Sequence, residues 1–162
     1  MVSTTPRTAA HVALDAALLD LRRVWMHPRL LRWFAEEVGT DVELATLRTL
    51  RAIETGGEQA ALGVSDLAAA MAVDASTASR LVEQAVAEGY VTRRASPRDR
   101  RRTELALTAE GERLLARSTE VRARMLGRAT RAWDDEDLIE LAELLTRLQV
   151  DLRGLLEDEE SP

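Results

Sequence analysis

Cysteine is absent from the 162-residue sequence, which excludes disulfide bonds, thiolate zinc sites and thiol redox switches. Two histidines, His11 and His27, are too few for a histidine-rich metal site, so we expect no metal. No stretch free of charged residues is longer than seven residues, which leaves no room for a membrane-spanning helix. The N-terminus has no basic flank before an apolar run, so we expect no signal peptide and a cytoplasmic location.

Lysine is absent too, since all 22 basic residues are arginine, and the net charge is −6. The charge is unevenly distributed. Between Ser76 and Glu104 there are four acidic residues and seven arginines, a balance of +3 that leaves −9 elsewhere; the arginines are Arg80, Arg93, Arg94, Arg98, Arg100, Arg101 and Arg102. A basic surface on an acidic protein can bind phosphate locally while the protein stays soluble. The composition therefore does not exclude nucleic acid as a partner.

Apolar residues make up 46% of the chain, enough for a core, and the length suits a single domain, 1–162. Abundant alanine and leucine favour helix almost throughout. We expect a first helical region over about 9–37, in which Pro28 begins a second helix or kinks the first. A further helix is expected over 42–54, before Gly56 and Gly57. Its inward side chains are Leu44, Leu47, Leu50 and Ile53.

Two short helices separated by about three residues follow, which is the arrangement of a helix-turn-helix. Ser65 is the predicted N-cap of a helix over 66–71, and Asp74 is the predicted N-cap of a helix over 75–88 that Gly89 ends. We expect Leu81, Val82 and Val86 to face inward from the second helix. Between the helices, Ala72 can adopt the turn if its φ stays negative.

After Gly89 the apolar period changes from that of a helix to that of a strand. Residues 90–94 and 103–107 are predicted strands, and the residues between them, with Pro97 and five charges, are a predicted exposed tip. Thr108 is the predicted cap of a helix reaching about Trp133, and four acidic residues open a last helix.

The last helix carries leucines at alternating spacings of three and four, which is typical of a coiled-coil seam. The run is shorter than three heptads, so we expect it to pack against other helices, including those of a second copy. The leucines are Leu138, Leu141, Leu145, Leu148, Leu152 and Leu155.

A helix-turn-helix followed at once by a basic hairpin suggests binding to double-stranded DNA. The second helix of such a motif enters the major groove with its N-terminal side chains toward the bases, and here these are Ser76, Thr77, Ser79 and Arg80. Each of the three hydroxyls contacts a base or a phosphate, or only caps the helix. The hairpin arginines are expected to reach the adjacent minor groove.

These residues resemble a known family. Asp99-Arg100-Arg101, then five residues, then Leu107-Thr108-Ala109-Glu110-Gly111, matches the D-x-R-x5-L-T-x-x-G wing signature of multiple-antibiotic-resistance-type (MarR) regulators. Residues 76–82 and 88–93 also resemble the recognition helix of that family where it runs into the wing.

The resemblance implies a mainly α fold with a small β-hairpin wing. A winged helix-turn-helix DNA-binding lobe would span 42–108, between dimerisation helices at 9–37 and 109–157. It also implies a homodimeric repressor of a pseudo-palindromic operator, often released by a small aromatic or phenolic effector. Arg101 would enter the minor groove and Asp99 would brace it, with Arg98 and Arg100 beside them on the DNA.

Two further assignments stay open from the sequence. Trp25, His27, Trp33 and Phe34 are candidates for an effector pocket, although aromatic residues at helical spacing are more often core. A winged-helix adaptor that binds an acidic protein surface and no DNA is the alternative function. We find no catalytic constellation, no glycine-rich phosphate loop and no cofactor motif, so we do not expect an enzyme.

Overall fold

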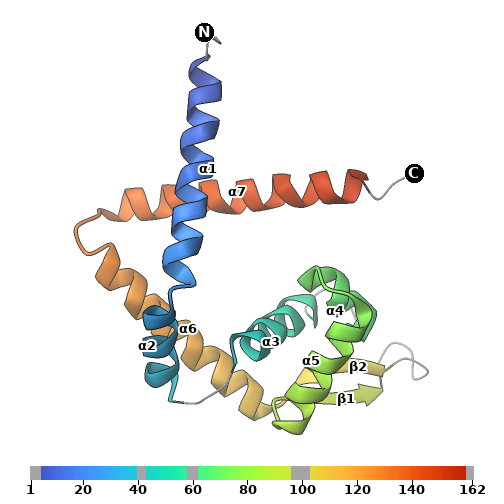
Figure 1. The fold of residues 1–162 in the computed structure, drawn as a ribbon. Coiled ribbons are helices and arrows are strands. Elements are labelled where there is room, and N and C mark those ends of the chain that lie inside the picture. The colour runs from blue at the N-terminus through green and yellow to red at the C-terminus, as the bar shows by residue number, and fades with distance from the viewer. Residues whose placement is uncertain (1–4, 40–42, 58–61, 96–102, 160–162) are drawn as a thin grey trace. The chain divides into compact units, whose positions relative to one another are not determined.

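The computed structural model describes residues 5–39, 43–57, 62–95 and 103–159, which form two compact units, Met1–Arg122 and Ala123–Pro162. Its elements are labelled in Figure 1. They are α1 (Pro6–Trp25), α2 (Pro28–Val38), α3 (Leu44–Gly57), α4 (Val64–Met71), α5 (Ala75–Ala87), β1 (Val91–Ala95), β2 (Thr103–Leu107), α6 (Ala109–Ala129) and α7 (Asp135–Glu159). None of the helices within the described ranges is long and apolar enough to cross a membrane. The expected mainly α fold with one hairpin is confirmed.

The first helical region is divided in two, as one of the two alternatives for Pro28 predicts. Met26 ends α1, and His27 caps α2 with its Nδ1 atom, which accepts the Arg29 N–H at 3.2 Å. Pro28 follows as the first residue of α2, where its missing N–H costs no helical hydrogen bond.

The helix-turn-helix begins two residues before the predicted start. Gly63, and not Ser65, is the N-cap of α4, because the Asp66 carboxylate accepts the Gly63 N–H at 2.8 Å and so stabilises the earlier start. Asp74 caps α5 as predicted, and its Oδ1 accepts the Thr77 N–H at 2.8 Å. The two helices of the motif are therefore joined by only Ala72, Val73 and Asp74.

The turn between α4 and α5 contains a left-handed alanine. Ala72 has φ +53° and ψ 49°, so this alanine adopts the turn without the negative φ that the sequence analysis set as a condition. In this conformation the Ala72 N–H donates to the Ala69 carbonyl and the Val73 N–H donates to the Ala68 carbonyl, both at 3.1 Å. These bonds satisfy carbonyls at the end of α4, which compensates for the steric cost at Cβ.

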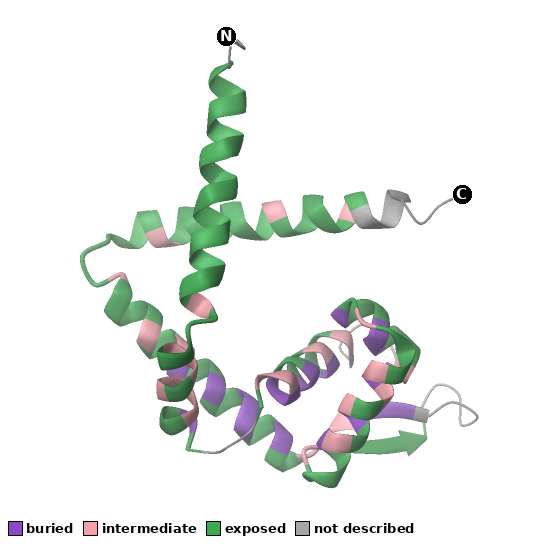
Figure 2. Ribbon diagram, in the orientation of Figure 1, coloured by how far each residue is buried: buried purple, intermediate pink, exposed green. Residues whose placement is uncertain are grey.

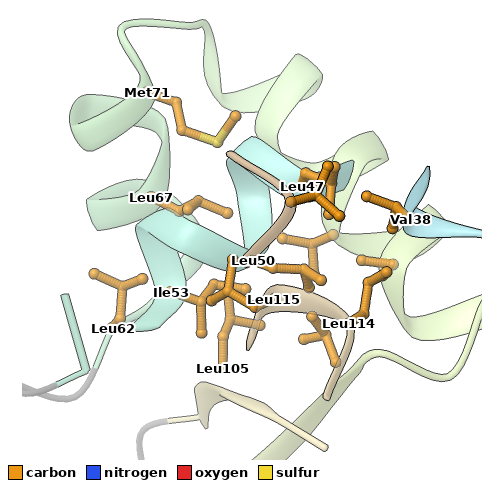
Figure 3. Close-up of a cluster of buried hydrophobic side chains, with 14 residues drawn as sticks. Val38, Leu47, Leu50, Ile53, Leu62, Leu67, Met71, Leu105, Leu114 and Leu115 are labelled. Atoms are coloured by element: carbon orange, nitrogen blue, oxygen red, sulfur yellow. The ribbon is translucent and has the colours of Figure 1, made fainter. Parts of the chain in front are cut away.

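The core of the first unit is built around α3 (Figure 3). Leu47, Leu50 and Ile53 of α3 are buried, and Leu50 has no exposed surface. Other elements contribute the remaining buried side chains, among them Val38, Leu67, Met71, Val82, Leu105, Leu114 and Leu115. Figure 2 shows the buried residues gathered on these elements.

The inward face of α5 differs from the prediction at one position. Ala78, Val82 and Ala85 are buried and Leu81 is half-buried, whereas Val86 is 38% exposed, so its predicted inward position was wrong. Small alanines at 78 and 85 allow α5 to pack closely, and the buried stripe is too narrow to include residue 86.

The hairpin pairs β1 and β2 antiparallel, from Val91 opposite Leu107 to Ala95 opposite Thr103. Val91 and Leu105 are buried in the core, which fixes one face of the hairpin against the helices. The Leu105 N–H also donates to the Leu62 carbonyl at 2.9 Å, so β2 is bonded on both sides. The predicted tip lies largely outside the described residues.

The Thr108 side chain links the segment before the hairpin to the start of α6, and Gly111 allows the two backbone segments to approach closely. The Thr108 hydroxyl donates to the Gly89 carbonyl at 2.7 Å and accepts the Gly111 N–H at 3.1 Å. A Cβ atom at Gly111 would lie 2.2 Å from the Tyr90 carbonyl oxygen. The threonine and glycine of the L-T-x-x-G motif are thus required by the close approach of two backbone segments.

Two long helices expose apolar side chains. On α1, Val12, Leu19 and Val24 are exposed, and on α7 the leucine seam is half-buried at Leu138 and Leu148 and exposed at its other described positions. Figure 2 shows almost the whole length of both helices as exposed. These faces lack a partner among the described residues.

We predict that Ala72→Gly raises the free energy of unfolding by about 0.5 to 1 kcal/mol. Glycine removes a Cβ strain of about 1 to 2 kcal/mol, and its more flexible unfolded chain offsets part of the gain. Urea unfolding measures the change. Ala116→Gly, at an exposed position within α6, is the matched control and should cost about 1 kcal/mol. A loss of stability in Ala72→Gly would contradict the left-handed turn.

We also predict opposite effects for one substitution at two glycines of α6. Gly111→Ala should destabilise the protein by about 2 kcal/mol or more, because the methyl group meets the Tyr90 carbonyl. Gly127→Ala should stabilise it by up to about 1 kcal/mol, because nothing lies within 4 Å of the added carbon. Thermal unfolding of both variants distinguishes this packing effect from a general preference for helix.

Candidate nucleic-acid interface

The first turn of α5 is organised by the carboxylate of Asp74. The Ser76 hydroxyl donates to Asp74 Oδ1, and the Thr77 hydroxyl donates to Oδ2 at 2.7 Å. With the Thr77 N–H, these hydrogen bonds hold the pKa of Asp74 well below its ordinary value, the Ser76 hydroxyl contributing most. Asp74 is therefore ionised at neutral pH and lies at the exposed start of the predicted recognition helix.

These hydrogen bonds determine which contacts the two hydroxyls can make. A hydroxyl has one proton and two lone pairs, and in both residues the proton is already donated to Asp74. Each oxygen can therefore accept a further hydrogen bond but cannot donate one. A phosphate oxygen requires a donor, whereas the amino groups of adenine and cytosine in the major groove require an acceptor.

The two other predicted α5 residues differ from this pair. Ser79 is half-buried, and its hydroxyl donates to Glu83 Oε1 at 3.4 Å. Arg80 is exposed and makes no ion pair with the described residues. It follows Ser76 by four residues, so both lie on one face of α5. That face offers acceptors at its first turn and a guanidinium one turn later.

The four predicted wing residues, Arg98, Asp99, Arg100 and Arg101, lie outside the described residues. Of the wing arginines within β1, Arg93 is exposed and Arg94 is held by Glu104, with Arg94 Nε 2.6 Å from Glu104 Oε1. Sequence reasoning counted Glu104 only as a negative charge and missed this pair. The observed register places residues 94 and 104 opposite each other, one residue away from the pairing that the ends of the predicted strands suggest.

The four candidate effector residues differ in burial and in the contacts they make. Trp33 and Phe34 pack against the core, and Trp25 is half-buried at the end of α1. His27 is exposed, and its Nδ1 is used in capping α2. The Arg122 guanidinium lies 5.6 Å from the centre of the Phe34 ring, and burial lowers the pKa of Arg122. The Phe34 ring of α2 and the Arg122 guanidinium therefore form a cation–π pair.

A hollow of about 580 Å³ lies over α6, lined by Arg124, Gly127, Arg128 and Arg131. It includes none of the four candidate effector residues. No group of three or more potential metal ligands occurs among the residues that the structure describes.

Comparison with known proteins identifies the fold. Residues 40–102, which contain α3, α4, α5 and β1, match a model of the MarR family. A MarR family protein from Bacillus stearothermophilus has a similar structure, with 22% identity, a TM-score of 0.69 and coverage of 93% of this chain and 99% of that chain. Curated proteins show no match to the chain.

Two further solved structures are similar. S. aureus MepR bound to ethidium bromide has 18% identity and a TM-score of 0.57, covering 80% of this chain and 95% of that chain. A mutant of MarR from E. coli has 21% identity and a TM-score of 0.60, covering 82% of this chain and 95% of that chain. The winged helix-turn-helix predicted from the motifs is confirmed.

Proposed function

Since the winged helix-turn-helix of this chain, residues 40–102, matches the MarR family, we propose that the protein is a DNA-binding transcriptional regulator located in the cytoplasm. One structural observation supports the proposal. The helix α5 begins with exposed polar side chains, stands in a helix-turn-helix, and leads directly into a hairpin with exposed arginine side chains on β1. In this arrangement α5 enters the major groove and the wing follows the adjacent backbone and minor groove.

We extend the proposal to a homodimeric repressor. The exposed apolar faces of α1 and α7 support it, since each is long and a second copy would bury it. Two α5 helices related by a twofold axis would enter major grooves about 10 base pairs apart on a pseudo-palindromic operator. In each half, Arg101 would enter the minor groove, braced by Asp99, with Arg98 and Arg100 at the phosphates.

An aromatic or phenolic effector completes the proposal. S. aureus MepR, whose fold is similar, has a solved structure bound to ethidium bromide, which is an aromatic compound. In this chain we propose that the effector contacts Phe34 and Arg122, which form a cation–π pair, and Trp33, which is also on α2. A mobility-shift assay tests the effector proposal, because added aromatic acids should release the protein from its operator.

We predict that the protein binds random duplex DNA weakly at low salt and a selected operator tightly, and that Arg101→Ala weakens operator binding about tenfold or more. Arg147→Ala, on the exposed side of α7, is the control and should leave binding unchanged. Mobility shift at matched salt measures both, and sedimentation gives the stoichiometry. A wild-type protein that binds no duplex at low salt would support the adaptor alternative.

The hydrogen bonds of Asp74 generate a second prediction. Because the Ser76 oxygen only accepts, we expect selected operators to present an adenine or cytosine amino group where α5 begins. Replacing such an adenine by nebularine, which lacks that amino group, should weaken wild-type binding about tenfold, within the usual 1–3 kcal/mol of a base contact.

Ser76→Ala should bind both duplexes with the lower affinity, so that the base analogue no longer matters. Ser65→Ala, an exposed serine within α4, is the control and should behave as wild type. If Ser76→Ala instead weakens binding to every sequence equally, its hydroxyl contacts a phosphate.

A further inference from the structure

The wing contains a buried acidic side chain. Glu104 is 5% exposed, although Thr92 and Arg94, which lie on the same face of the hairpin, are exposed. Its burial is therefore not a property of that face. A carboxylate removed from water is costly unless it is paired, and here its partner is Arg94, directly opposite on β1.

The geometry of this pair leaves most of the guanidinium available. The contact with Glu104 Oε1 is made by Arg94 Nε, at 2.6 Å. Of the five N–H groups of an arginine, the four on the terminal nitrogens remain, and the Arg94 side chain is 61% exposed. The guanidinium is thus fixed at its inner nitrogen, and its outer edge faces solvent. Two parallel N–H groups on a fixed plane match the geometry of a phosphate.

We propose that Arg94 contacts a DNA phosphate beside the wing and that Glu104 is its positioning residue. The inference rests on the proposed DNA-binding function. The pairing stabilises the buried Glu104 carboxylate, and it leaves the outer edge of the Arg94 guanidinium exposed to a partner outside the hairpin. A planar cation held by a buried carboxylate has lost its rotational freedom before binding, which favours a directed hydrogen bond.

Arg94 differs from its neighbour in its long-range attraction to DNA. The charge of Glu104 offsets that of Arg94, so the pair adds little to the long-range attraction between protein and DNA. The neighbouring Arg93 is exposed and makes no ion pair with the described residues, so its charge acts in full. Arg94 then contributes through a directed contact with one phosphate, which positions the protein on any duplex.

The test compares operator and random duplex over a range of salt for four variants. Arg94→Lys keeps the charge and loses the paired N–H groups, so the affinities for operator and random duplex should fall together, about tenfold, with the salt slope unchanged. Glu104→Gln removes the charge that offsets Arg94, so the salt slope should steepen by about one on both duplexes.

Arg93→Lys and Glu110→Gln are the controls. Arg93→Lys keeps the charge of Arg93 and should change neither affinity. Glu110→Gln breaks an exposed ion pair on α6, with Arg113, and should also change neither affinity. If Arg94→Lys leaves both affinities unchanged and Glu104→Gln leaves the salt slope unchanged, the pair is structural only and the inference is overturned.

Thermal unfolding shows whether Glu104→Gln folds. If Glu104→Gln does not fold, Arg94→Lys, which changes an exposed side chain, still tests the proposed role of Arg94. The two proposals fail in different ways. A wild-type protein that binds neither duplex overturns the proposed function, whereas a wild type that binds the operator with Arg94→Lys unaffected overturns only the role of Arg94.

Discussion

The winged helix-turn-helix depends on the burial of one side of α3. Leu47, Leu50 and Ile53 each leave water almost completely, which stabilises the fold by about 1.5 to 3 kcal/mol per side chain. Helices α4 and α5 and strand β2 all pack on this helix, so it determines their mutual arrangement. The exposed first turn of α5 and the arginines of β1, Arg93 and Arg94, have a defined geometry because their elements belong to the unit whose core is built around α3.

The apolar spacing predicted most of this fold, and the errors lie where backbone hydrogen bonds decide. The helices of the motif, the cap at Asp74 and the presence of the hairpin follow from local patterns. The start of α4 at Gly63 depends on a reciprocal bond from Asp66, and Ser65 offered an equally good local signal. The positive φ of Ala72 arises because two carbonyls of α4 need donors, which residue preferences do not reveal.

In the candidate site too, the sequence predicts the positions of residues but not the contacts that their side chains make. The position of Ser76 and Thr77 at the start of α5 was predictable, but the use of their protons by Asp74 was not, since it requires the positions of three side chains. Glu104 was visible only as a charge, and its burial requires the folded hairpin. The assignment of Arg101 and Asp99 rests on the spacing of the wing motif, and nothing within the described residues adds to it.

The ionised carboxylate of Asp74 has a consequence for the proposed docking of α5 on DNA. A negative charge at the start of this helix is repelled by nearby phosphates. Under the proposed function, placements of the helix that bring this charge against the sugar–phosphate backbone would therefore be disfavoured relative to placements opposite base edges.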